Sequence, residues 1–266
     1  MKNTLKNIRL FLFDMDGTLY LGSRLFDFTI ELLDTIKAQG KRYMFMTNNS
    51  SKSVSDYVAK LAKMGIDATE EDFFTSSQAT ALYLLEHHRG QKLYVCGTRS
   101  LKAELAKNGF EITEDTGDTD CIVMGFDTEL TFQKLHDISY LLLTRPDIPY
   151  IATNPDYVCP TEFGSVPDCG SVCDMLYNVS RRRPVVIGKP KPEMPLLAMK
   201  KAGVTPDQTA VIGDRIYTDI KSGLSAGAYT VLVLSGETTR EILDASSDKP
   251  HAVMDSAEEL LHILKQ

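Results

Sequence analysis

The chain has 266 residues, of which 43% are apolar and 24% are charged, as in an ordinary globular protein. Its 36 acidic and 29 basic side chains give a formal net charge of −7, which argues against a general binding surface for nucleic acid or anionic membranes. The length predicts about two domains, or one large one, able to fold without disulfides or a structural metal.

The start of the chain carries no long apolar segment. The run from Leu10 to Phe13 is interrupted by Asp14, and it is too short for a signal peptide or a membrane helix. The five cysteines form an odd set without a CxxC pair, which favours free thiols in a reducing compartment. We therefore expect a cytoplasmic protein.

Strand and helix patterns alternate along the first part of the chain. They predict strands at 8–13 and 43–46 and helices at 28–36, 52–64 and 77–88. This alternation predicts parallel strands that are joined by right-handed crossovers.

The middle of the chain has strand and helix patterns of its own, and the end repeats the first scheme. The middle predicts strands at 92–96, 121–124 and 148–152 and helices at 100–108 and 131–144; the end predicts strands at 185–187, 210–212, 229–234 and 251–253 and helices at 192–202 and 257–265. We expect an α/β core formed by residues 1–89 and 184–266, with a smaller α/β domain, residues 90–183, inserted into it.

Two carboxylates follow the first predicted strand. Asp14 and Asp16 lie where reactive groups collect in open parallel sheets, and a pair so close together favours a bound cation. A loop aspartate beside an Asp-Gly turn is the open alternative. A calcium EF-hand is excluded because Thr18 and Leu25 occupy ligand positions, and a glycosidase pair gains no support.

A second acidic pair, Asp214 and Asp219, follows a later strand. If the two strands are neighbours, Asp14, Asp16 and Asp214 converge. Three carboxylates without a nearby histidine or cysteine favour a hard ion such as Mg²⁺. The alternative is an acidic helix start that is capped by Thr218 and Asp219.

Two more polar segments also follow predicted strands. Lys189 is not part of a Walker A loop, since Arg183 and Pro190 stand where that motif requires Gly and Ser or Thr. The hydroxyl and amides of Thr47–Ser50 open a predicted helix and suit a phosphate. A solvated surface lysine and an ordinary helix cap remain the alternatives.

Together these segments resemble a known family. DMDGT, TNNSS, GKPKP and GDRIYTD, in this order, are similar to the four motifs of the haloacid dehalogenase (HAD) superfamily. The insertion between the second and third motifs is similar to the class 2 cap, and ATNPDYVCPTE at 152–162 resembles the NagD-like nitrophenylphosphatases. The resemblance implies a Rossmann-like parallel-sheet core with an inserted α/β cap that selects the substrate.

The resemblance also implies catalytic roles. Asp14 would be the nucleophile that forms an aspartyl-phosphate, and Asp16 would be the general acid and then the general base. Mg²⁺ would be bound by Asp14, the backbone carbonyl of Asp16 and Asp214.

Phosphate binding and support are implied at further positions. Thr47, Asn48 and Asn49 would hold phosphate oxygens, and Lys189 would stabilise the charge on phosphate and nucleophile. Asp219 would orient Lys189 or the metal's waters.

We therefore expect a Mg²⁺-dependent phosphatase for small phosphate monoesters, such as sugar phosphates or nucleoside monophosphates. The alternatives are a phosphotransferase or mutase with the same intermediate, and a non-catalytic phosphate-binding module. The expected partner is a small phosphorylated metabolite, with no nucleic acid or membrane, and the resemblance adds a homodimer through the cap. Cap candidates for substrate choice are Asn154, Asp156, Glu162, Asp168 and the expected loop from Gly164 to Cys173, which includes Cys169. A loop cap or turn residue is the open alternative for each of them.

Overall fold

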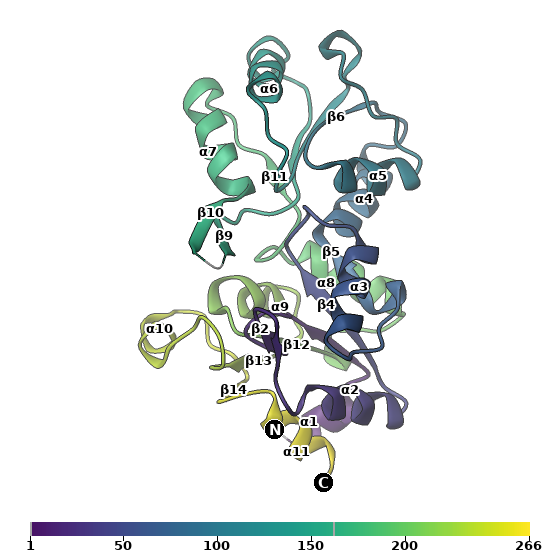
Figure 1. Ribbon diagram of the computed structural model, residues 1–266, viewed down its shortest axis with the longest axis vertical. Helices are drawn as coiled ribbons and strands as arrows, with labels where there is room; N and C mark the ends of the chain where they lie inside the picture. The colour runs from purple at the N-terminus through teal and green to yellow at the C-terminus, as the bar shows by residue number, and fades with distance from the viewer. Residues whose placement is uncertain (1, 162) are drawn as a thin grey trace. The chain divides into compact units, whose positions relative to one another are not determined.

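The computed structural model describes residues 2–161 and 163–266, which form two compact units (Figure 1). The core unit comprises the residues up to Thr47, Val54–Phe74 and Lys189–Gln266. The inserted unit comprises Asn48–Ser53 and Thr75–Gly188. The chain therefore passes between the units at four places: 47/48, 53/54, 74/75 and 188/189.

A six-stranded sheet with the order β14-β13-β12-β1-β4-β5 lies at the centre of the core unit. Its strands are β1 (Leu10–Phe13), β4 (Arg42–Thr47), β5 (Phe73–Thr75), β12 (Thr209–Gly213), β13 (Tyr229–Val233) and β14 (Ala252–Met254). β1 is fully buried and pairs in parallel with β12 on one side and β4 on the other. The carboxyl ends of these three strands therefore reach the same edge of the sheet.

Helices complete the core unit. They are α1 (Lys2–Asn7), α2 (Thr29–Ala38), α3 (Val54–Lys63), α8 (Glu193–Ala202), α9 (Lys221–Ser225), α10 (Arg240–Ala245) and α11 (Glu258–Leu264), with a π-helical turn η4 (Ile216–Ile220), 3₁₀ turns η1 (Glu70–Asp72) and η3 (Pro206–Gln208) and a small hairpin of β2 (Tyr20–Leu21) and β3 (Arg24–Leu25). α2 buries Leu32, Leu33 and Ile36 in the main apolar cluster, as its helical spacing predicts. The helices at the two ends of the chain, α1 and α11, contact each other (Figure 1).

The inserted unit contains a second parallel sheet, with the order β11-β8-β7-β6. Its elements are α4 (Ser76–His87), β6 (Leu93–Cys96), α5 (Arg99–Lys107), the 3₁₀ turn η2 (Thr116–Asp118), β7 (Cys121–Met124), α6 (Phe132–Thr144), β8 (Tyr150–Ala152), a β9 (Val158–Thr161) and β10 (Gly164–Pro167) hairpin, α7 (Cys169–Ser180) and β11 (Val185–Val186). Ile138, Leu141 and Leu176 of α6 and α7 pack in its apolar cluster. Within the described residues, we find no helix that is long and apolar enough to cross a membrane.

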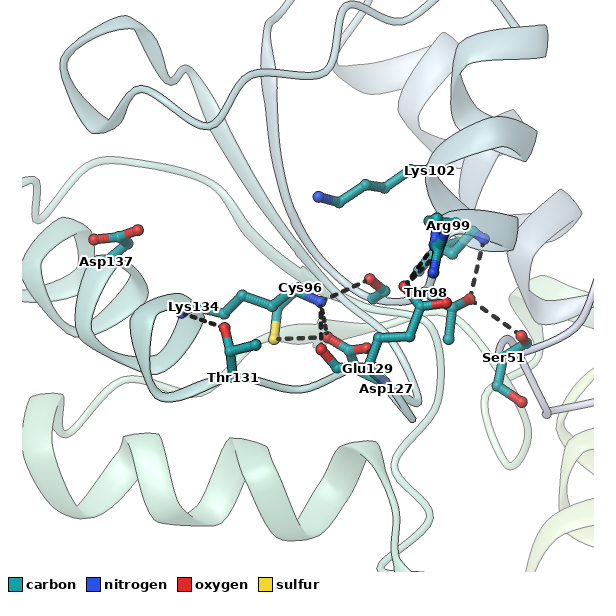
Figure 2. A network of polar contacts seen from close by, with 12 residues as sticks. Ser51, Cys96, Thr98, Arg99, Lys102, Asp127, Glu129, Thr131, Lys134 and Asp137 are labelled. Atoms are coloured by element: carbon teal, nitrogen blue, oxygen red, sulfur yellow. Dashed lines mark hydrogen bonds and ion pairs between the residues drawn. The ribbon is translucent and has the colours of Figure 1, made fainter.

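A polar network joins the strand ends of the inserted unit (Figure 2). The Lys134 ammonium lies 2.7 Å from the Asp127 carboxylate and donates to the carbonyl of Gly97 at 3.2 Å. The Thr98 hydroxyl donates to the carbonyl of Ser51 at 3.1 Å (Figure 2). This network ties the short Asn48–Ser53 segment to the inserted sheet.

Two local expectations differ from the structure. The strand expected at 185–187 in the core is β11, which pairs with β8 of the inserted sheet. Val185 and Val186 supply β-branched side chains that suit this pairing, and the chain returns to the core unit after Gly188. The loop expected from Gly164 to Cys173 contains β10 and the start of α7, because the Asp168 side chain caps that helix by accepting from the Cys169 amide.

The predicted domain ranges, 1–89 with 184–266 and 90–183, stay a prediction. In the structure, α4 groups with the inserted unit instead of the core unit. Glu162 lies outside the described residues.

Candidate active site

The acidic residues of two motifs lie at adjacent strand ends. Asp14 follows β1 and Asp214 follows β12, and the parallel register places Phe13 opposite Ile212. The Asp14 amide extends this ladder by donating to the carbonyl of Ile212 at 2.8 Å. Pairing of two buried strands thus brings together carboxylates that are 200 residues apart in the sequence.

Lys189 joins these strand ends through its ammonium group. The side chain is 3% exposed, and Nζ donates to Asp14 Oδ1 at 2.8 Å and to Asp219 Oδ1 at 2.5 Å. Nζ also donates to the backbone carbonyl of Met46 in β4, at 3.0 Å. These bonds connect the segments that follow β1 and β12 with the end of β4.

Asp219 supports the cluster from the π-helical turn η4. Its Oδ1 accepts from Lys189, and its Oδ2 accepts from the backbone amide of Arg215 at 3.1 Å. A Cβ at Gly213 would lie 2.4 Å from Asp219 Cγ, so this approach requires glycine. Both carboxylate oxygens are thus bound within the protein, and the supporting role of Asp219 stays a prediction.

The Asp214 carboxylate is held by a backbone amide. Its Oδ2 accepts from the Glu237 amide at 2.7 Å. A Cβ at Gly236 would lie 2.0 Å from that oxygen, and one at Gly17 would lie 2.5 Å from it. Gly17 also has φ +79°, which favours glycine for a second reason.

The carboxylates fit a hard divalent cation. One oxygen from each of Asp14, Asp214 and Asp219 lies within 4.8 Å of the others. Asp214 Oδ1 is buried and has no hydrogen-bond partner among the residues that the structure describes. A buried carboxylate oxygen without a partner is costly unless a cation binds it, and an all-oxygen donor set suits Mg²⁺.

The ionisation of the cluster reflects burial and mutual charge. Burial, with the charges of Asp14 and Asp219, raises the pKa of Asp214 to about 8. Burial also raises the pKa of Asp219 to about 6, although Lys189 opposes this rise. Burial alone would lower the pKa of Lys189, but Asp14 and Asp219 outweigh it and raise that pKa above its ordinary value.

Asp16 lies on the exposed side of the turn after β1. Its Oδ1 accepts from the Gly22 amide at 3.3 Å, and the Gly17 amide closes the turn by donating to the carbonyl of Tyr20 at 2.7 Å. Its carboxylate is outside the group formed by the other three aspartates. A solvent-accessible carboxylate beside the cluster is suited to exchanging protons with a substrate and water.

The segment expected to bind phosphate begins at the end of β4. Thr47 is the last residue of that strand, and the following residues belong to the inserted unit. The Asn48 amide donates to Asp156 Oδ2 at 2.8 Å, while Asn49 Oδ1 accepts from the Ser51 amide at 2.9 Å. The phosphate-binding roles of these residues stay a prediction.

Two backbone features of the site were absent from the sequence analysis. They are the Met46 carbonyl, which accepts from Lys189, and the Gly236–Glu237 backbone, which holds Asp214. Every residue has a backbone carbonyl, so the pattern of side chains cannot show which carbonyl accepts from Lys189. Gly236, however, lies in a Ser-Gly-Glu segment directly after a predicted strand. Because functional groups collect at the carboxyl ends of parallel strands, the sequence offers a signal for this position.

Comparison with known proteins settles the family. The family profile of haloacid dehalogenase-like hydrolases matches residues 11–111, and a second profile, described as HAD-hydrolase-like, matches residues 186–260. The 5'-nucleotidase YutF of Bacillus subtilis is 34% identical over 255 residues, which cover 96% of this chain and 98% of that protein. The chain belongs to the haloacid dehalogenase-like hydrolases.

Comparison with further HAD proteins identifies the subfamily. The solved structure of 4-nitrophenylphosphatase from Thermotoga maritima has a TM-score of 0.92 and 39% identity, covering 97% of this chain and 98% of that one. NagD from E. coli K-12 has a TM-score of 0.87 and 31% identity, covering 95% and 98%. The acid sugar phosphatase of Staphylococcus aureus is 33% identical over 237 residues, covering 89% and 90%. This HAD chain is thus a NagD-like phosphatase, a phosphoric monoester hydrolase.

Proposed function

We propose that the chain hydrolyses small phosphate monoesters, such as sugar phosphates or nucleoside monophosphates, with Mg²⁺ and through an aspartyl-phosphate on Asp14. The observation that carries this proposal is the buried Lys189 ammonium, which bonds Asp14 next to a carboxylate cluster. In that cluster, one oxygen of Asp214 has no hydrogen-bond partner within the described part of the chain. This arrangement offers a nucleophile, a fixed positive charge and a cation site at one sheet edge.

The first step transfers the phosphoryl group to the protein. A carboxylate oxygen of Asp14 attacks phosphorus, the phosphorus–oxygen bond to the leaving group breaks, and Asp16 protonates the leaving oxygen. In the second step the Asp16 carboxylate takes a proton from water, whose oxygen attacks phosphorus. The acyl-phosphate bond breaks, which releases inorganic phosphate and restores Asp14.

Positive charge makes this attack feasible. Lys189 offsets the negative charge of Asp14 and of the transferred phosphoryl group. Asp14, the backbone carbonyl of Asp16 and Asp214 would hold Mg²⁺, whose charge lets a carboxylate approach a phosphate dianion. The hydroxyl of Thr47 and the amides of Asn48 and Asn49 are donors suited to the phosphate oxygens.

The relatives support the substrate class without selecting one ester. Their names cover a nucleotidase, a sugar phosphatase and a nitrophenylphosphatase, so the shared chemical group is the phosphate monoester. A small phosphorylated metabolite is the partner that fits this class. The inserted unit supplies the residues that select it.

Phosphate release from p-nitrophenyl phosphate tests the proposal. We expect turnover with Mg²⁺ and its loss after chelation, with recovery when Mg²⁺ is restored. Asp14→Asn should lower turnover to below about a thousandth of wild type while the protein stays folded. The matched control is Asp27→Asn, which removes an exposed carboxylate outside the cluster and should leave turnover unchanged.

The product ratio separates hydrolysis from transfer. Equal amounts of nitrophenol and inorganic phosphate, in the presence of an added alcohol or sugar, indicate hydrolysis. A shortfall of phosphate would instead indicate the phosphotransferase alternative. Normal turnover by Asp14→Asn would contradict the assignment of the nucleophile.

A further inference from the structure

We propose that Asp156, in the inserted unit, is a positioning residue that orients the Asn48 amide for phosphate binding; this inference rests on the proposed function. Asp156 Oδ2 accepts from Asn48 Nδ2 at 2.8 Å and from Asn154 Nδ2 at 3.0 Å. One carboxylate oxygen thus connects the second HAD motif to the segment that resembles the NagD-like enzymes.

The bond to Asp156 determines whether the nitrogen or the oxygen of the Asn48 amide faces that carboxylate. A side-chain amide has a donating nitrogen and an accepting oxygen, whereas an ionised carboxylate only accepts. Asp156 therefore holds the nitrogen of Asn48 toward itself and disfavours the flipped amide. Because the nitrogen carries two hydrogens, it can donate to Asp156 and also to a phosphate oxygen, whereas a flipped amide would present an oxygen to the anion.

The other end of the amide is restrained by backbone. A Cβ at Gly188 would lie 2.7 Å from Asn48 Oδ1 and 2.5 Å from the carbonyl of Thr153. The Gly188 amide donates to that same carbonyl at 2.9 Å. Asn48 Oδ1 thus packs against a glycine that has no room for a side chain.

Asp156 is itself held in place by the start of α7. The Gly170 amide donates to the backbone carbonyl of Asp156 at 2.8 Å, and a Cβ at Gly170 would lie 2.2 Å from the carbonyl of Pro155. Asn154 is fully buried and also donates to Asp168 Oδ1 at 3.0 Å. A carboxylate on so constrained a loop can fix the direction of its partner.

The rest of the Asn48–Ser53 segment is anchored to the inserted unit as well. The Ser76 hydroxyl donates to the Asn48 carbonyl at 2.6 Å, and Ser50 Oγ accepts from the Phe126 amide at 2.9 Å. Together with the bond to the carbonyl of Ser51 in Figure 2, these contacts fix the backbone of the segment. The Asn48 side chain is in turn contacted by Asp156 and Gly188.

A double-mutant cycle tests the proposal in the full-length protein with Mg²⁺. The variants are Asn48→Ala, Asp156→Ala and the pair, and the readouts are KM and kcat for p-nitrophenyl phosphate and the Kd of inorganic phosphate by calorimetry. We expect Asp156→Ala to raise KM and Kd about tenfold with a smaller change in kcat, as loss of one oriented hydrogen bond predicts. In the Asn48→Ala background, Asp156→Ala should add no further loss.

Two further variants separate positioning from folding. Asp156→Asn keeps an accepting oxygen and should restore most of the affinity, which a role in overall charge would not allow. Ser171→Ala removes a hydrogen bond to the carbonyl of Tyr157 on the same loop, and it should leave KM and Kd at wild-type values.

Losses that multiply in the double mutant would overturn the inference, because independent sites behave in that way. Wild-type KM and Kd in Asp156→Ala, or in Asn48→Ala, would overturn it too. A wild-type protein that releases no phosphate would instead overturn the proposed function, and the inference with it.

Discussion

At the scale of single residues, Lys189 holds the site together. It is buried between two carboxylates that come from different motifs, so its charge stabilises both the fold and the proposed nucleophile. From the strand ends, the sequence predicts that Asp14, Asp16 and Asp214 converge if their two strands are neighbours, whereas the place of Lys189 beside them comes from the resemblance to the family. The sequence could not show that Lys189 also bonds a backbone carbonyl, because that contact depends on the position of β4 beside β1.

Replacing Lys189 with methionine should destabilise the protein and abolish turnover. The change leaves Asp14 and Asp219 without their shared positive charge, which costs about 3–5 kcal/mol in free energy of unfolding at neutral pH. Urea unfolding measures this cost. Lys191→Met is the matched control, since Lys191 is exposed two residues away and its loss should not shift the urea midpoint.

The loss of unfolding free energy in Lys189→Met should depend on pH. Burial raises the pKa of Asp219 to about 6, and loss of Lys189 removes the opposing charge. A carboxyl whose pKa is raised in the folded state binds more protons there than in the unfolded state, so stability falls as pH rises through that pKa. The deficit of Lys189→Met should therefore be largest at pH 8 and shrink toward pH 5.5; a deficit independent of pH would contradict this account.

At the scale of elements, the sequence predicted the parallel strands well, because long apolar runs with helices between them have few other arrangements. It missed α7, whose start contains Gly170 and two cysteines instead of strong helix formers. The cap from Asp168 and the packing of Gly170 against the backbone of Pro155 outweigh that local preference. The sequence pattern also placed β11 in the core sheet, whereas it pairs with β8 of the inserted sheet. The residue types of a two-residue strand do not determine which strand it pairs with.

The loop after β13 offers a steric test of the site. Gly236→Ala should weaken Mg²⁺ binding and lower turnover, because the new Cβ would lie 2.0 Å from Asp214 Oδ2 and displace that carboxylate. Calorimetric titration with Mg²⁺ measures the affinity, and thermal unfolding measures the strain. In the Asp214→Ala background the same change should cost little stability; an equal cost in both backgrounds would show that the strain lies elsewhere.

At the scale of the whole molecule, all five cysteines belong to the inserted unit. Cys96, Cys121, Cys169 and Cys173 are buried, while Cys159 on β9 is partly exposed. Burial raises the pKa of Cys121 to about 12, so its thiol is protonated at pH 8 and reacts slowly. Thiol reactivity therefore measures the exposure of cysteines in the inserted unit and gives no information on the core unit.

Labelling with a chromogenic disulfide reagent should show one fast thiol in the native protein at pH 8. Cys159→Ser should remove this fast phase, whereas Cys121→Ser should leave it unchanged. The four buried thiols should react only at urea concentrations that unfold the inserted unit, as followed by circular dichroism. Fast labelling of more than one thiol without urea would contradict the burial described here.

The four crossings between the units have a consequence for recombination. A chimera that takes only residues 90–183 from a relative would separate Asn48 from the Asp156 with which it is paired, and α4 from its neighbour α5. A chimera that keeps these contacts needs junctions at all four crossings, so that the Asn48–Ser53 segment comes from the same parent as the rest of the inserted unit. Part of one motif is thus inherited with the inserted unit instead of with the strand that precedes it.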